Sequence, residues 1–286
     1  MLLNVFEPTP GDGIGKRVAE SVFAYLEELG PSAIAKLSAI VSDNGSDAKS
    51  ACDYLRFLIN QHLGREAIPD AYSIRCADHC IQLGVKESLK AIYPQIEKLR
   101  DLIKFIRNSK RVRYQYRQEA SRRKEELRID SVEPPVLDCP TRWNSTHVMC
   151  DDALKKRPVL DYIANREKDL FVYLLTGPDW DQIERVVQFL SVPRSIMEQA
   201  AKDRSPTLNM VLPTFDVLVN HAAKYAVESN EDSFLKDASK SMLTKLEKYR
   251  IVLLKEPALI DNYLDPRFPK PSNPLKFEEL KAMIRK

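Results

Sequence analysis

Residues Leu37–Asn44, which read LSAIVSDN, decide how the rest of the chain is interpreted. The apolar run contains Ile40 and Val41, which favour a strand packed on both of its faces, and it ends at Asp43. Side chains that follow the carboxyl ends of strands in α/β sheets commonly bind ligands, so Asp43 is a candidate functional residue. A helix is expected to follow, and Asp is also a favoured helix cap. On these residues alone, a capping role for Asp43 is favoured over a ligand-binding role.

The composition indicates an intracellular globular protein. The chain has 286 residues, of which 44% are hydrophobic and 30% are charged, and this balance differs from that of disordered proteins. No apolar run approaches the roughly 20 residues that span a bilayer, so we expect no membrane partner. The N-terminal stretch lacks the basic region of a signal peptide. The five cysteines form an odd and sparse set, which argues against a disulfide framework.

The net charge of +3 hides a strongly basic segment. Residues 98–128 contain twelve Lys or Arg and four Asp or Glu, so this segment carries +8 and the rest of the chain −5. Its central part interleaves Tyr114 and Tyr116 with five arginines, which are Arg111, Arg113, Arg117, Arg122 and Arg123. Basic side chains that alternate with aromatic rings suit a nucleic-acid backbone, whereas a solvated helix face explains the same charges about as well. Both interpretations stay open at this point.

Apolar periodicity divides the chain near residue 140. Before this point strands alternate with helices, which predicts an α/β sheet with parallel crossovers. The predicted elements are a helix over 14–29, a strand over 37–44, a helix over 47–63, a strand over 72–76 and a long helix over 81–106. After residue 140 only helical patterns are found, over 145–164, 179–202, 208–228 and 232–255. We therefore predict a partial α/β region over 1–140 and a helical region over 141–286.

Three short motifs suggest chemistry, and each has a simpler alternative. Gly11–Lys16 is similar to a phosphate-binding loop, but Arg17 stands where that motif needs Ser or Thr. Cys76 and His79 have a spacing that suits metal ligands. A zinc site needs about four ligands, however, and no second pair of this kind is present, so ordinary structural roles are the simpler interpretation. Trp143, at the start of a predicted helix, can stack on an unpaired base or anchor a core.

The order of four sequence blocks resembles that of the hAT (hobo/Activator) superfamily of DNA transposases. The blocks are SDNGSDA at 42–48, CADHCIQL at 76–83, TRWNST at 141–146 and LIDNYLDPRF at 259–268. Each block alone is a weak signal, but their order and spacing agree with the family over most of residues 14–268. The resemblance implies an α/β ribonuclease H-like fold with an incomplete sheet, followed by a mainly α-helical insertion domain.

The resemblance also implies roles for individual residues. Asp43 matches the second acid of the family's Asp-Asp-Glu triad, which implies a catalytic residue that binds Mg²⁺ or Mn²⁺. Cys76 and His79 match a Cys-x-x-His motif near the active site, which in the family is not a structural zinc site. Trp143 matches a Trp associated with a flipped base at the transposon end, and Arg142 precedes it. DNA is thus the implied partner of these residues and of the basic segment.

The first and third acids of the triad have no counterpart that can be recognised in this sequence. The acids before Asp43 follow no strand of the family's type, and nothing around Glu278 and Glu279 matches the third acid. One carboxylate cannot hold two metal ions, so we expect a nuclear, transposase-derived protein that is catalytically inactive by itself and retains DNA binding. Two alternatives stay open, an active Mg²⁺-dependent transposase or nuclease whose other acids come from elsewhere, and a protein-interaction scaffold. Self-association, or association with a full-length relative, is a further expectation.

Overall fold

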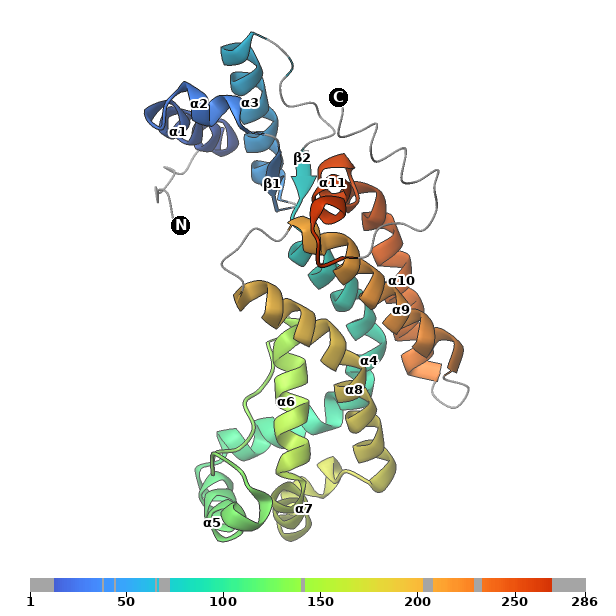
Figure 1. The fold of residues 1–286 in the computed structure, drawn as a ribbon. Helices are drawn as coiled ribbons and strands as arrows, with labels where there is room; N and C mark the ends of the chain where they lie inside the picture. Colours follow the sequence, from blue (N-terminus) through green and yellow to red (C-terminus); the bar gives the residue numbers. More distant parts are fainter. Residues whose placement is uncertain are drawn as a thin grey trace. The chain divides into compact units, whose positions relative to one another are not determined.

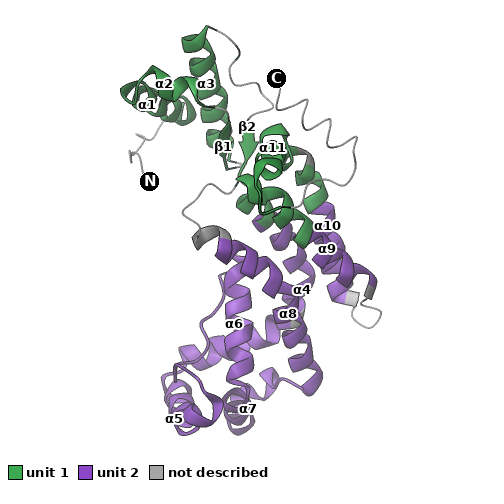
Figure 2. Ribbon diagram, in the orientation of Figure 1, with its two compact units in different colours: residues 1–81, 202–217, 246–286 green, residues 82–201, 218–245 purple. Residues whose placement is uncertain are grey.

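The structure of the chain is a computed structural model, and it describes residues 13–37, 39–43, 45–64, 66, 73–139, 142–202, 208–228 and 233–268 (Figure 1). The described part consists of two compact units, which Figure 2 colours separately. Unit 1 comprises Met1–Ile81, Lys202–Val217 and Leu246–Lys286, and unit 2 comprises Gln82–Ala201 and Leu218–Lys245. The domain boundary predicted at residues 140 and 141 lies outside the described residues and stays a prediction. The start of the Gly11–Lys16 motif, Glu278 and Glu279 also lie outside them.

Unit 1 begins with three helices, α1 (Ile14–Glu28), α2 (Pro31–Ala35) and α3 (Ser46–Leu63). The helices predicted over 14–29 and 47–63 are confirmed to within one residue. Their apolar faces meet around Ala19, Leu55 and Ile59, as the helical spacing of these residues requires. Gly15 is buried against the first turn of α3, where an added Cβ would lie 2.6 Å from the backbone oxygen of Asp47. Gly15 therefore serves close packing of α1 against α3.

The sheet of unit 1 has two parallel strands, β1 (Ile40–Ser42) and β2 (Ser73–Arg75). Val41 pairs with Ile74, and α3 lies in the crossover that joins the strands. Both predicted strands are present in shorter form, and their parallel arrangement is confirmed. The prediction of burial on both faces is wrong for Val41, which is 56% exposed. Only two short strands pair among the described residues, so the sheet is too narrow to enclose that side chain and does not establish a complete ribonuclease H-like core.

The LDPRF block, residues 264–268, lies in unit 1 and takes part in a small cluster of hydrogen bonds. The short helix η3 (Leu208–Met210), which lies at the start of the helical pattern predicted over 208–228, packs here against α11 (Glu256–Leu264), which was not predicted. The carboxylate of Asp265 accepts hydrogen bonds from Nδ2 of Asn209 and, at 2.7 Å, from Nη2 of Arg267. Lys255 donates to the backbone oxygen of Ser73 at 2.8 Å, which ties the start of α11 to β2. The Arg267 side chain and backbone N–H lower the pKa of Asp265, so this carboxylate stays ionised.

Unit 2 is helical. It contains most of α4 (Ala77–Asn108) and α8 (Gly177–Lys202), all of α5 (Lys110–Leu127), α6 (Trp143–Lys155), α7 (Arg157–Arg166) and η2 (Lys168–Tyr173), and parts of α9 (Val211–Glu228) and α10 (Ser233–Leu253). The long helix predicted over 81–106 is confirmed as part of α4, and its apolar stripe is buried from Val85 to Ile106. The helix predicted over 179–202 is confirmed as α8, with Ile183, Val186 and Leu190 buried.

The pattern predicted as one helix over 145–164 forms two helices, α6 and α7. Lys156 separates them with a backbone conformation outside the helical region, and Pro158 lies at the start of α7. Proline lacks the N–H that would continue the hydrogen-bond ladder of α6, whereas it is well tolerated in the first turn of a new helix. Pro158 is thus the signal for the break. None of the described helices combines the length and the apolar character that a membrane crossing requires.

Candidate active-site edge and candidate nucleic-acid interface

Asp43 lies at the carboxyl end of β1, and its side chain is exposed. Its Oδ1 accepts a hydrogen bond of 2.7 Å from the backbone N–H of Gly45. This contact closes an Asx turn, in which an Asp side chain takes the place of a backbone carbonyl. The N-cap position of α3 is Gly45, so Asp43 shapes the approach to the helix without capping it. The capping interpretation is corrected accordingly, and the position at the end of a strand is confirmed.

The carboxyl ends of the two parallel strands bring three of the predicted residues to one edge. The backbone N–H of Cys76, just after β2, donates to the oxygen of Ser42 at 2.6 Å. His79 lies in the first turn of α4, which begins directly after Cys76. Arg75, which was not predicted, donates from Nη1 to the backbone oxygen of Asp43 at 3.0 Å. Asp43, Arg75 and Cys76 therefore lie at the ends of the two strands, and Asp78 and His79 follow in the first turn of α4.

The edge at Asp43 does not fit a divalent metal ion as it stands. Nowhere in the described part of the chain do three His, Cys, Asp or Glu side chains gather closely enough to hold an ion. Mg²⁺ requires about six oxygen ligands in octahedral geometry. One oxygen of the Asp43 carboxylate already accepts a hydrogen bond from Gly45, and the cationic side chain of Arg75 contacts the backbone oxygen of the same residue. The catalytic and metal-binding roles of Asp43 stay predictions, and no chemical step is derived through Mg²⁺ or Mn²⁺.

Trp143 is the first residue of α6 and is only 1% exposed. This burial supports the interpretation of Trp143 as a core anchor. Arg142, at the N-cap position, is exposed, and its backbone N–H donates to the oxygen of Cys139 at 2.8 Å. The Ser145 hydroxyl donates to the backbone oxygen of Arg142 at 2.6 Å and accepts from the N–H of Cys139 at 2.7 Å. DNA contacts by Trp143 and Arg142 stay predictions.

A buried ionic network supports the start of α6 and has no signal in the sequence. Arg100 of α4 donates to both oxygens of Asp138, at 2.9 Å and 2.6 Å, and its guanidinium lies 4.2 Å from the ring centre of Tyr93. Thr146 donates to the same carboxylate at 2.8 Å. Bidentate arginine–carboxylate pairs fix orientation as well as distance. The network therefore holds the loop before α6 against α4, and Arg100 is not available to an outside partner.

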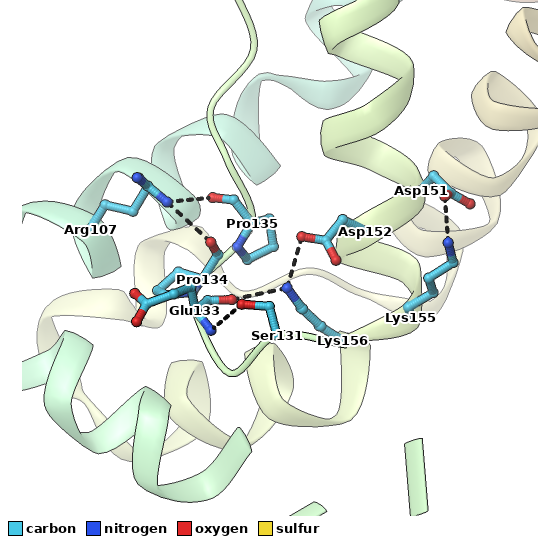
Figure 3. Close-up of polar contacts among 9 residues, drawn as sticks. All are labelled: Arg107, Ser131, Glu133, Pro134, Pro135, Asp151, Asp152, Lys155 and Lys156. Carbon is cyan, nitrogen blue, oxygen red and sulfur yellow. Dashed lines mark hydrogen bonds and ion pairs between the residues drawn. The ribbon is translucent and has the colours of Figure 1, made fainter. Parts of the chain in front are cut away.

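Two further cations fasten the loop between α5 and α6 (Figure 3). Nζ of Lys156, which is buried, donates to the backbone oxygen of Glu133 at 3.0 Å and to the Asp152 carboxylate at 2.9 Å. Nη1 of Arg107 donates to the backbone oxygens of Pro134 and Pro135, at 3.1 Å and 3.2 Å. The carbonyl oxygens of a loop that is part of no helix or strand need donors from elsewhere in the chain, and these two side chains supply them. Arg107 belongs to the basic segment, and part of that segment's charge is therefore structural.

The five arginines of the basic segment that were predicted to bind DNA all lie on α5, and each has an intramolecular partner. The contacts are Arg111 with Glu167 at 2.7 Å, Arg113 with the backbone oxygen of Arg107 at 3.3 Å, Arg117 with Glu133 at 2.8 Å, Arg122 with Glu119 at 3.7 Å and Arg123 with Glu119 at 2.6 Å. The Arg117 side chain is the main cause that lowers the pKa of Glu133, and Arg111 does the same for Glu167. Both carboxylates are therefore ionised partners near neutral pH.

Exposure separates the aromatic and basic side chains of α5 into two groups. Arg111, Arg117 and Arg122 are exposed, and the side chain of Arg122 is 74% exposed. Tyr114 is also exposed, whereas Tyr116 is fully buried, and burial raises its pKa above the ordinary value. The interpretation of the sequence assigned the same role to both tyrosines. Of the two tyrosines, Tyr114 alone can therefore reach a nucleic acid without rearrangement of the helix.

Parts of this chain are similar in sequence to a known domain family and to several longer proteins. Residues 74–189 match the family model described as the ZBED1 RNase-like helical domain. The zinc finger BED domain-containing protein RICESLEEPER 3 of Oryza sativa subsp. japonica is 23% identical over 244 residues, which cover 82% of this chain and 30% of that protein. The putative AC transposase of Zea mays is 24% identical over 200 residues, which cover 70% of this chain and 24% of that protein.

A third relative is named as a regulator. The putative transcriptional regulator tpeD of Talaromyces stipitatus is 24% identical over 251 residues, which cover 77% of this chain and 28% of that protein. The chain spans less than a third of the length of each of these three relatives. The match to an RNase-like helical domain extends from β2 into α8, so it includes α5, the network at Arg100 and Trp143.

Proposed function

We propose that this chain is a hAT-type transposase-related protein that binds DNA in the nucleus through the exposed arginines of α5. The observation that carries the proposal is the extension of Arg111, Arg117 and Arg122 from one basic helix into solvent. The names of its relatives, which include a putative transposase and a putative transcriptional regulator, support a DNA partner and a nuclear location.

The ion pairs on α5 do not prevent such binding. Exposed ion pairs contribute about 0–1 kcal/mol each, because water screens the charges and both side chains lose freedom. A DNA phosphate that replaces the carboxylate beside Arg117 or Arg122 also releases counterions from the DNA, which favours binding at low salt. A phosphate can thus displace the exposed Glu133 from Arg117, whereas the buried Glu119 keeps its partner Arg123 when Arg122, 3.7 Å away, turns to a phosphate.

Duplex binding at several salt concentrations tests this proposal. We expect log K for a short labelled duplex, measured by fluorescence anisotropy, to fall linearly with log salt. Arg117→Ala and Arg122→Ala should each weaken binding to all sequences alike and reduce the steepness of the salt dependence by about one.

Arg250→Ala is the matched control for these variants. Arg250 is an exposed arginine of α10 that pairs with Glu247 three residues away at 3.6 Å, as Arg122 pairs with Glu119 at 3.7 Å. The control should bind duplex like the unaltered protein. Affinity that does not change with salt, or equal losses in the control and the α5 variants, would contradict a phosphate interface on α5.

We further propose that this chain does not cleave DNA by itself. Asp43 is the one triad acid recognised in the sequence, and its surroundings do not fit a metal ion. With Mg²⁺ or Mn²⁺, the purified chain should nick supercoiled plasmid no faster than Asp43→Ala. Metal-dependent nicking that Asp43→Ala abolishes would show that the chain is an active nuclease.

A further inference from the structure

A shallow groove runs between α5 and α7, which lie side by side in unit 2 (Figure 1). We call it the α5–α7 groove. Its volume is about 200 Å³. It is lined from α5 by Tyr114, Gln118 and Arg122 and from α7 by Tyr162 and Arg166, among others. These are aromatic, amide and guanidinium side chains, which together can recognise a flat ring and an anion attached to it.

The carboxylates of the α5–α7 groove are already neutralised. Glu119 is buried and receives a hydrogen bond of 2.6 Å from Arg123. Glu167 is held by both terminal nitrogens of Arg111, each at 2.7 Å. Arg166 donates to the hydroxyl of Tyr162 at 2.7 Å, which is a neutral partner. The groove is lined by two arginines and two glutamates, and Arg111 and Arg123 pair with those glutamates from its flanks, where Asp169 and Glu126 add two further carboxylates. The guanidinium groups of Arg122 and Arg166 are therefore the groups that can bind an anionic ligand.

The aromatic groups give the groove its second property. Tyr114 is 63% exposed, although contact between the apolar part of its ring and water costs free energy. The ring of Tyr162 is flanked by the guanidinium groups of Arg166, at 5.1 Å, and Arg123, at 5.9 Å. Arginines at these distances hold an aromatic ring through cation–π attraction. Gln118 is exposed beside them, and its amide can both donate and accept hydrogen bonds.

We propose that the α5–α7 groove binds an unpaired nucleotide of single-stranded nucleic acid, with Tyr114 against the base and Arg122 and Arg166 at its phosphates. This inference rests on the proposed function and deepens it. Base–aromatic stacking requires a base whose face is open, which a duplex does not present. A phosphorylated peptide would satisfy the arginines but would leave the exposed ring of Tyr114 without a role.

The test compares one labelled single strand, oligothymidine, with a duplex of the same length. Loss of one stacked base costs about 5- to 100-fold in affinity for single strands. Tyr114→Ala should show a loss in this range for oligothymidine and less than a twofold change for the duplex. Tyr114→Phe keeps the ring and should restore binding. Phe171→Ala, which removes another exposed ring of unit 2, should bind both probes normally.

The possible outcomes distinguish this inference from the proposed function. If Tyr114→Ala binds the single strand as well as the unaltered protein does, or loses both probes equally, the groove assignment is overturned while DNA binding stands. If neither probe binds the unaltered protein, the proposed function itself fails. A phosphotyrosine peptide that displaces oligothymidine, and whose binding needs Arg122 and Arg166 but not Tyr114, would also overturn the assignment.

Discussion

Gly15 is suited to its position because it lacks a Cβ atom. It lies in the first turn of α1 against α3, and an added Cβ would lie 2.6 Å from the backbone oxygen of Asp47 and 2.8 Å from Cβ of Ser50. Backbone atoms of a helix cannot move aside as a flexible side chain can. We therefore expect Gly15→Ala to lower the free energy of unfolding by about 1–3 kcal/mol, measured by denaturant titration followed by circular dichroism.

The control for this substitution is Gly177→Ala. Gly177 is the first residue of α8, and nothing lies within 4 Å of a Cβ added there. Without a clash, the change should alter stability by no more than about 1 kcal/mol in either direction. If Gly15→Ala is as stable as the control, close packing does not explain this glycine, and its place in a glycine-rich motif needs another explanation.

At the scale of elements, the sequence predicted what depends on local periodicity. Helices α1, α3, α4 and α8 carry apolar stripes that no other local structure would bury, so their positions were predictable. The exposure of Val41 could not be predicted, because the burial of a strand depends on how many strands and helices surround it. The pairing of Arg100 with Asp138 could not be predicted either, since 38 residues separate them and their contact exists only after α4 and the loop are packed.

In the candidate sites too, features that depend on local sequence were predictable and features that depend on tertiary packing were not. The location of Asp43 at the end of a strand was predictable from an apolar run that stops at an acid. Its neighbours Gly45 and Arg75 were not, because they depend on the turn and on the parallel register of β2. On α5 the charge count was correct, but composition could not show that Tyr116 faces the core while Tyr114 faces solvent.

At the scale of the whole molecule, two histidines make the stability of unit 2 depend on pH. Nδ1 of His147, which is buried, accepts a hydrogen bond from Nη1 of Arg194 at 2.8 Å. Burial and the charge of Arg194 lower the pKa of His147. Burial also lowers the pKa of His221, whose Nε2–H donates to the backbone oxygen of Phe189 at 2.8 Å. Both rings thus remain neutral in the folded unit at pH values where an unfolded histidine binds a proton.

We expect the free energy of unfolding to fall as the pH is lowered through about 6.5, the ordinary pKa of histidine. Between the lowered folded pKa and that value the unfolded chain binds more protons, so acid favours unfolding, and the loss ends below the folded pKa. Both tryptophans of the chain are buried in unit 2, so their fluorescence during urea unfolding at pH 8 to 5 reports on it. His147→Asn keeps an acceptor for Arg194 and should flatten this dependence, with His62→Asn on the exposed surface of α3 as the control. An equally steep dependence in His147→Asn would mean that acid acts on other groups of the unit.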